Sequence, residues 1–181
     1  MSSSEYCLYS GGLKGAEKTF GECAEAHGIK EVTFSFDGHK LSRDKNVRVL
    51  SEEELSRGHI SMEIVSTKMG RKYAHTATIR KVFQVIFHMI NNGYQVFSIG
   101  WIQPDSTVRG GTGWGIELAK FFNRPVSVFD QTTNQWHTWQ DHKWVVDTPV
   151  ISHKTFCGTG TRSLSEEGKK AIEDLFNRSF S

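Results

Sequence analysis

Residues 5–36 read EYCLYSGGLKGAEKTFGECAEAHGIKEVTFSF, and this stretch decides the fold. Residues 5–10 favour a strand, and a glycine-rich turn follows them. The apolar side chains of residues 15–28 then share one helical stripe, namely Ala16, Phe20, Cys23 and Ala24, and Gly28 is a typical end for such a helix. Residues 31–36 alternate apolar and polar side chains, as a strand does. A strand, a helix and a second strand at this spacing predict the first unit of a parallel sheet.

The same pattern continues downstream. Residues 79–90 carry apolar side chains at helical spacing, and the apolar run YQVFSIGW at residues 94–101 predicts a strand buried on both faces. A second glycine cluster at residues 110–115 opens a helix whose inner face is expected to carry Leu118, Phe121 and Phe122. Residues 125–130 then predict another strand.

Three further segments are less regular. We expect residues 37–74 to form a loop-rich insertion that covers a site, with a short serine-capped helix at residues 51–59. Residues 135–147 predict a hairpin that carries Trp136, Trp139 and Trp144. A third glycine-containing loop, GTGTR at residues 158–162, precedes a last helix that Ser163 or Ser165 caps.

These elements predict an α/β fold, a Rossmann-like parallel sheet with helices on both faces and a small Trp-rich β-hairpin insertion. A chain of 181 residues with 37% hydrophobic content is expected to form one domain over residues 1–181. The net charge of +2, spread along the chain, makes nucleic acid an unlikely partner.

Cysteine usage and hydropathy bear on the compartment. Three cysteines without a CxxC pair are a poor disulfide framework, which favours a reduced, cytoplasmic location. No segment is long and apolar enough to span a membrane. The histidines and cysteines lack the spacing of a metal site, so no metal and no cofactor are expected.

The glycine turns predict a phosphate site. Glycine lets the backbone approach an anion, and the N-terminus of a helix favours negative charge. In an open parallel sheet such turns lie beyond the carboxyl ends of the strands, where ligands bind. Candidate binding residues are Ser10, Gly11, Gly12 and Lys14 in the first turn, Arg109, Gly110, Gly111, Thr112, Gly113 and Trp114 in the second, and Arg162 in the third. The alternative is that these glycines serve only tight turns and close packing.

Known phosphate motifs do not match these turns. The first turn is not GxxxxGK[ST], and GxGxxG does not follow the first strand, so nucleoside triphosphatases and ordinary dinucleotide dehydrogenases are disfavoured. No GxSxG elbow is present either.

Two stretches carry a family resemblance. YSGGLKGAEKTFGECAEAHG at residues 9–28 resembles the first strand, turn and helix of the SLOG superfamily, which includes the LOG nucleotide phosphoribohydrolases. GGTGWGIE at residues 110–117 is similar to the PGGxGTxxE signature of LOG proteins, with Arg109 in place of the proline. The resemblance implies a nucleotide site, Glu117 as a catalytic carboxylate at the ribose, Arg80 of an Arg-Lys pair as a second catalytic residue, and a homodimer.

Two functions from different classes remain open, and the near-neutral charge disfavours a third, a DNA-processing role. In the first, the chain hydrolyses the N-glycosidic bond of a nucleoside monophosphate, with Glu117 assisting at the ribose. In the second, the same turns form a nucleotide-sensing module without chemistry. A Glu117 favoured only by the helix dipole would fit the second.

Overall fold

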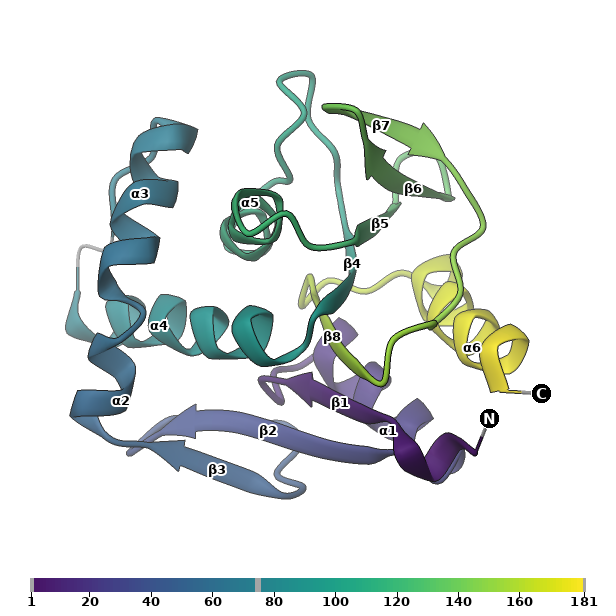
Figure 1. Cartoon of the computed structure of the whole chain (residues 1–181), viewed down its shortest axis with the longest axis horizontal. Coiled ribbons are helices and arrows are strands. Elements are labelled where there is room, and N and C mark those ends of the chain that lie inside the picture. The colour runs from purple at the N-terminus through teal and green to yellow at the C-terminus, as the bar shows by residue number, and fades with distance from the viewer. Residues whose placement is uncertain (1, 74–75, 181) are drawn as a thin grey trace.

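The computed structural model describes residues 2–73 and 76–180, and it is an α/β structure built on an eight-stranded sheet (Figure 1). The sheet order is β3-β2-β1-β8-β4-β5-β6-β7. The strands are β1 (Cys7–Ser10), β2 (Lys30–Phe36), β3 (Val47–Leu50), β4 (Gln95–Gly100), β5 (Val126–Asp130), β6 (Gln135–Gln140), β7 (Lys143–Val146) and β8 (Thr155–Gly160). All neighbours from β3 to β5 are parallel, whereas β6 and β7 add on antiparallel.

The helices predicted from the apolar periodicity occur in the expected order, and the structure contains further helical segments between them. They are α1 (Ala16–Ala26), α2 (Glu52–Ser56), α3 (His59–Met69), α4 (Ala77–Asn92), α5 (Thr112–Phe121) and α6 (Glu166–Phe180), and a short 3-10 turn, η1 (Ser3–Glu5), precedes β1. The strand, helix and strand predicted from residues 5–36 are present, and β1 and β2 pair in parallel with Ser10 opposite Thr33.

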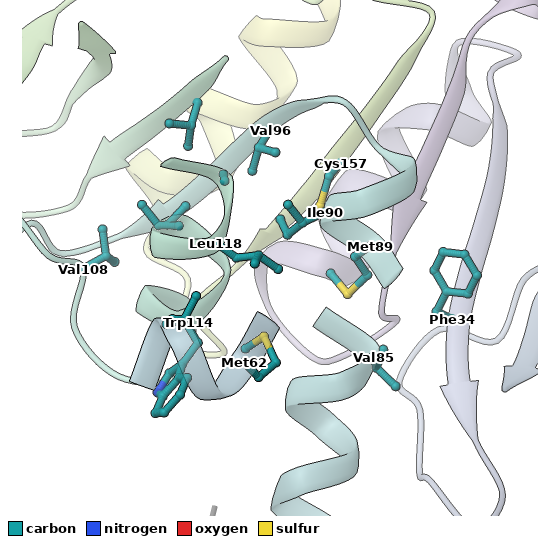
Figure 2. Close-up of a cluster of buried hydrophobic side chains, with 14 of the residues drawn as sticks. Phe34, Met62, Val85, Met89, Ile90, Val96, Val108, Trp114, Leu118 and Cys157 are labelled. Carbon is teal, nitrogen blue, oxygen red and sulfur yellow. The ribbon is translucent and has the colours of Figure 1, made fainter. Parts of the chain in front are cut away.

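Two hydrophobic clusters take alternate residues of the central strands. In β4, Val96 belongs to one cluster and Phe97 to the other, as expected when successive side chains of a strand point to opposite faces. Helices α1 and α6 contribute to the cluster of Phe97, and α3, α4 and α5 contribute to the cluster of Val96. Figure 2 shows the cluster that contains Val96, with Met89 of α4 and Leu118 of α5 among its side chains.

The predicted loop between residues 37 and 74 was largely wrong. The segment holds β3, α2 and α3, although residue 74 itself lies outside the described residues. β3 escaped prediction because it is a short edge strand in which only Leu50 is buried. The expected serine cap is present, since Ser51 and Glu54 form a reciprocal capping box at the start of α2.

The third glycine loop was also wrong, because residues 155–160 form β8 in the centre of the sheet, between β1 and β4 (Figure 1). Glycine inside a strand is unusual and marks close approach by a neighbour. A Cβ on Gly158 would lie 2.4 Å from Cγ of Phe20, a fully buried side chain of α1. Glycine at this position therefore lets α1 pack directly on the strand.

The structure tests two further predictions, the inner face of α5 and the serine that caps α6. Phe121 was expected on the inner face of its helix, but its side chain is 42% exposed, whereas Leu118 is fully buried. Of the two candidate serine caps, Ser165 is the one that accepts a hydrogen bond from the N–H of Gly168, in the first turn of α6.

Candidate functional site

A cavity of about 300 Å³ opens where β1, β8 and β4 end. The three strands are parallel neighbours, so their carboxyl ends lie at the same edge of the sheet. The chain leaves β1 towards β2 on one side and leaves β4 towards β5 on the other, which makes this edge the point where the strand order reverses. Ligands of open parallel sheets bind at such points. The lining comprises Gly11, Leu13, Glu17, His39, Val82, Phe83, Val85, Ile86, Met89, Gly100, Trp101, Arg109, Gly110, Gly111, Thr112, Gly115, Thr159, Gly160, Thr161 and Arg162.

Two glycines let the strand ends approach their neighbours at this edge. Gly12 has a φ of +69°, and a Cβ there would lie 2.4 Å from the carbonyl oxygen of Arg43. Gly160 has a φ of +146°, and its Cβ would lie 2.6 Å from the carbonyl oxygen of Ile99. Both positions are therefore closed to side chains, and at Gly160 the backbone itself forms part of the cavity wall.

Two helices begin at the cavity. α1 and α5 each start without a side-chain hydrogen bond to their first N–H groups. In α1 the N–H of Ala16 donates to the carbonyl of Thr161 at 3.0 Å, which ties the end of β8 to the start of the helix. In α5 Gly111 and Thr112 lie in the cavity wall. The first turns of both helices, where the dipole is positive, thus border the same cavity.

Basic and aromatic side chains surround the same space. Arg109 and Arg162 both line it, and the guanidinium of Arg109 lies 4.0 Å from the ring centroid of Trp101. His39 stacks on Phe36 with ring centroids 4.3 Å apart. Burial lowers the pKa of His39, and the positive charge of Arg162 lowers it further. At neutral pH, therefore, the two arginines supply the positive charge of the cavity and His39 is neutral.

Glu17 is the buried acid of the cavity. Its Oε2 accepts a hydrogen bond of 2.7 Å from the hydroxyl of Thr159, and its Oε1 accepts one of 3.1 Å from the N–H of Leu13. Burial raises the pKa of the Glu17 carboxyl, although both hydrogen bonds and the charge of Arg162 act in the opposite direction. The carboxyl group is held between the first glycine turn and β8.

One part of the cavity lining is apolar. Helix α4 contributes Val82, Phe83, Val85, Ile86 and Met89 to the lining. Val85 and Met89 also belong to the hydrophobic cluster of Figure 2, so the wall of the cavity is the surface of the core. A ligand here would contact hydrogen-bonding and charged groups as well as the apolar side chains of α4.

The structure brings six of the predicted binding residues to this cavity. These residues are Gly11, Arg109, Gly110, Gly111, Thr112 and Arg162. They come from the first, second and third glycine stretches, although the third stretch begins within β8, which ends at Gly160.

The other predicted binding residues lie outside the lining. Ser10 donates its hydroxyl hydrogen to the carbonyl of Gly158 at 2.7 Å, and the carbonyl of Gly12 accepts from the loop at residues 42–43. Lys14 is exposed. A Cβ on Gly113 would meet the carbonyl of Val108, so this glycine serves packing. Trp114 is 4% exposed and stacks on Phe83 at 4.4 Å between ring centroids, which places its ring in the core.

Neither predicted catalytic residue lies in the cavity lining. Oε2 of Glu117 lies 2.8 Å from the ammonium of Lys120, which in turn lies 3.8 Å from the ring centroid of Trp139. Lys120 also donates to the carbonyl of Ser106. Glu117 therefore helps to join α5 to the hairpin of β6 and β7. The guanidinium of Arg80 lies 5.3 Å from the ring centroid of Tyr73.

Sequence reasoning missed several residues of the lining, Glu17 first among them. A signal was present, because Glu17 lies on the same helical stripe as Phe20 and Ala24, both fully buried. An acidic residue on an apolar stripe indicates a carboxyl group turned inwards. Thr159 carried no such signal, because the strand that places it, β8, was expected to be a loop.

Two kinds of feature are absent from the described residues. Across residues 2–73 and 76–180, no three histidine, cysteine, aspartate or glutamate side chains gather as ligands of a metal ion would. Within the same ranges, no helix has the length and apolar character needed to cross a membrane.

Comparison with known proteins leaves the site to be interpreted from its own geometry. No family model matches the chain, and neither a curated protein nor a solved structure matches it.

Proposed function

We propose that the chain binds a nucleoside monophosphate, or a ligand derived from one, in the cavity at the ends of β1, β8 and β4. The observation that carries the proposal is that the first turns of two helices, two arginines and an apolar face of α4 line one cavity. Helix N-termini and arginine guanidinium groups both bind phosphate, and an apolar wall suits a base.

The size of the cavity supports a small ligand. A volume of about 300 Å³ lies at the lower end of the range for small-molecule sites. A mononucleotide suits this volume better than a dinucleotide does.

The proposal includes a fold assignment. The strand order on either side of β8 and the position of the cavity support a Rossmann-like sheet with helices on both faces. β6 and β7 then form a Trp-rich hairpin added at one edge, where Trp139 packs on Trp144 with ring centroids 5.0 Å apart. This arrangement and the first glycine turn are in keeping with the resemblance to the SLOG superfamily.

The test is a panel of adenosine, guanosine, cytidine and uridine 5′-monophosphates, the matching nucleosides and inorganic phosphate, measured by thermal shift and calorimetry. Replacing Arg109 and Arg162 with glutamine should weaken binding of the preferred monophosphate at least tenfold, because each arginine supplies a charged hydrogen bond. Lys143→Gln, which removes an exposed positive charge on β7, should leave binding unchanged. Equal binding by the double arginine variant, or no binding by any nucleotide, contradicts the proposal.

Hydrolysis of the N-glycosidic bond is a second function for the same site, and the buried carboxyl of Glu17 favours it. A sensor would bind the nucleotide and release it unchanged. Chromatography of the incubated nucleotide for free base separates these two activities.

A further inference from the structure

Glu17 is the buried acid of the cavity, and hydrogen bonds fix the position of its carboxyl group. Both oxygens of its carboxyl group accept a hydrogen bond, one from the backbone and one from Thr159. Its side chain is buried against the first glycine turn, where a Cβ on Gly11 would lie 2.7 Å from Oε1. Any side chain at position 11 would therefore collide with the carboxyl group.

The charged and titratable groups around Glu17 come from three elements, namely β8, α5 and β2. Arg162 follows β8, Arg109 precedes α5, His39 follows β2, and Cys157 lies on β8. Arg162 favours the ionised carboxylate, whereas the pKa of the fully buried Cys157 thiol is raised, so this group stays neutral. Burial outweighs the attraction of Arg162, and the proton stays on Glu17 at higher pH than on an exposed glutamate.

We propose that Glu17 is the general acid of the cavity and donates its proton to the base as the N-glycosidic bond of a bound nucleoside monophosphate breaks. This inference rests on the proposed function. The bond between C1′ of the ribose and the base nitrogen breaks, and its electron pair goes to the nitrogen, which takes the proton of Glu17. Water adds to C1′ and returns a proton to Glu17, so that the products are the free base and ribose 5-phosphate.

A protonated Glu17 suits both parts of this step, namely donation of the proton and stabilisation of the positive charge that follows. A neutral carboxylic acid is the form that donates a proton, and the carboxylate that results stabilises the positive charge that develops on the ribose ring. The hydroxyl of Thr159 then stabilises that carboxylate, because it donates to Oε2. Thr159 is thus a positioning residue that also adjusts the acidity of Glu17.

The first experiment compares kcat and Kd of the wild type with those of Glu17→Gln, using the four nucleoside 5′-monophosphates as probes. Glutamine keeps the shape of the side chain and one acceptor oxygen, and its amide group can donate to the hydroxyl oxygen of Thr159, so binding should change less than about threefold while base release falls at least about 100-fold. Glu22→Gln, an exposed change on the same helix, is the matched control. Retention of base release by Glu17→Gln, or its loss in Glu117→Gln alone, overturns the assignment.

A second variant keeps the proposal open to test if glutamine disturbs the fold. Thr159→Val removes the hydroxyl that lowers the pKa of Glu17, so the decline of kcat at alkaline pH should move to higher pH. A purely structural role for Thr159 would leave the pH profile in place, and that result counts against the proposal.

The wild-type protein separates the two proposals. Binding of a monophosphate without release of its base overturns the role of Glu17 and leaves the nucleotide site intact. Failure of every nucleotide to bind overturns both.

Discussion

The buried ion pair between Arg43 and Glu31 holds the loop that packs on the first glycine turn. Nε of Arg43 donates to Oε2 of Glu31 at 3.0 Å, and the two side chains are 9% and 7% exposed. The N–H groups of Ser42 and Arg43 both donate to the carbonyl of Gly12. Gly21 makes room for the pair, since a Cβ there would lie 2.3 Å from Nε of Arg43.

Replacing Arg43 with methionine should lower the free energy of unfolding by about 3–5 kcal/mol, because the Glu31 carboxylate would remain buried without a partner. For a chain of this size that corresponds to a fall in Tm of roughly 6–20 °C. Glu31→Gln should cost less than half as much. Arg43 keeps a second carboxylate in that variant, since Glu25 lies 3.8 Å from its Nη2 and is 60% exposed.

The assay is equilibrium unfolding in urea, followed by tryptophan fluorescence and circular dichroism, with linear extrapolation to water. Lys45→Met serves as the control, because Lys45 is 58% exposed and pairs with Glu25 at the surface. Such pairs contribute about 0–1 kcal/mol. A cost below about 1 kcal/mol for Arg43→Met, or a larger cost for Glu31→Gln, would refute the reasoning.

Three more predictions concern other parts of the fold. Gly158→Ala should destabilise the protein by about 1–3 kcal/mol in the same urea assay, because the added methyl group would overlap the buried ring of Phe20; an unchanged midpoint contradicts this. Since burial raises the pKa of Glu17, the wild type loses stability as the pH rises through that value, and thermal unfolding should show Glu17→Gln with the higher Tm above neutral pH and an equal Tm below about pH 4. A constant difference in Tm across this range would rule out titration as the cause. Ser51→Ala should cost about 1 kcal/mol by loss of the cap of α2, with faster amide exchange at Glu54 as the local measurement, and unchanged exchange there would argue against the cap.

Strong local patterns explain what the sequence could predict. β1, α1 and β2 follow from apolar periodicity and a glycine turn within 32 contiguous residues, and α4 follows from a long apolar stripe. β8 did not follow, because Gly158 and Gly160 weaken the strand pattern, and the reason for both glycines is contact with Phe20 and Ile99, distant in sequence.

Some residues of the candidate site could likewise be predicted from the sequence, and others could not. Gly11, Gly110 and Gly111 could be predicted because glycine at a strand-to-helix turn has a local cause. The role expected for Glu117 depended on a motif, and the motif does not show that Lys120 takes up this carboxylate. The orientation of the Glu17 carboxyl group could not be predicted, because it depends on a hydrogen bond from Thr159 of β8.

The central position of β8 has a consequence for synthesis of the protein. β1 and β4 both pair with this strand, so a ribosome that has released only the first 150 residues has made the two outer parts of the sheet but not the strand that joins them. Each part then exposes an unpaired strand edge, which is a template for pairing with another chain. The nascent protein is therefore prone to aggregation until residues 155–160 leave the exit tunnel and β8 can pair with both edges.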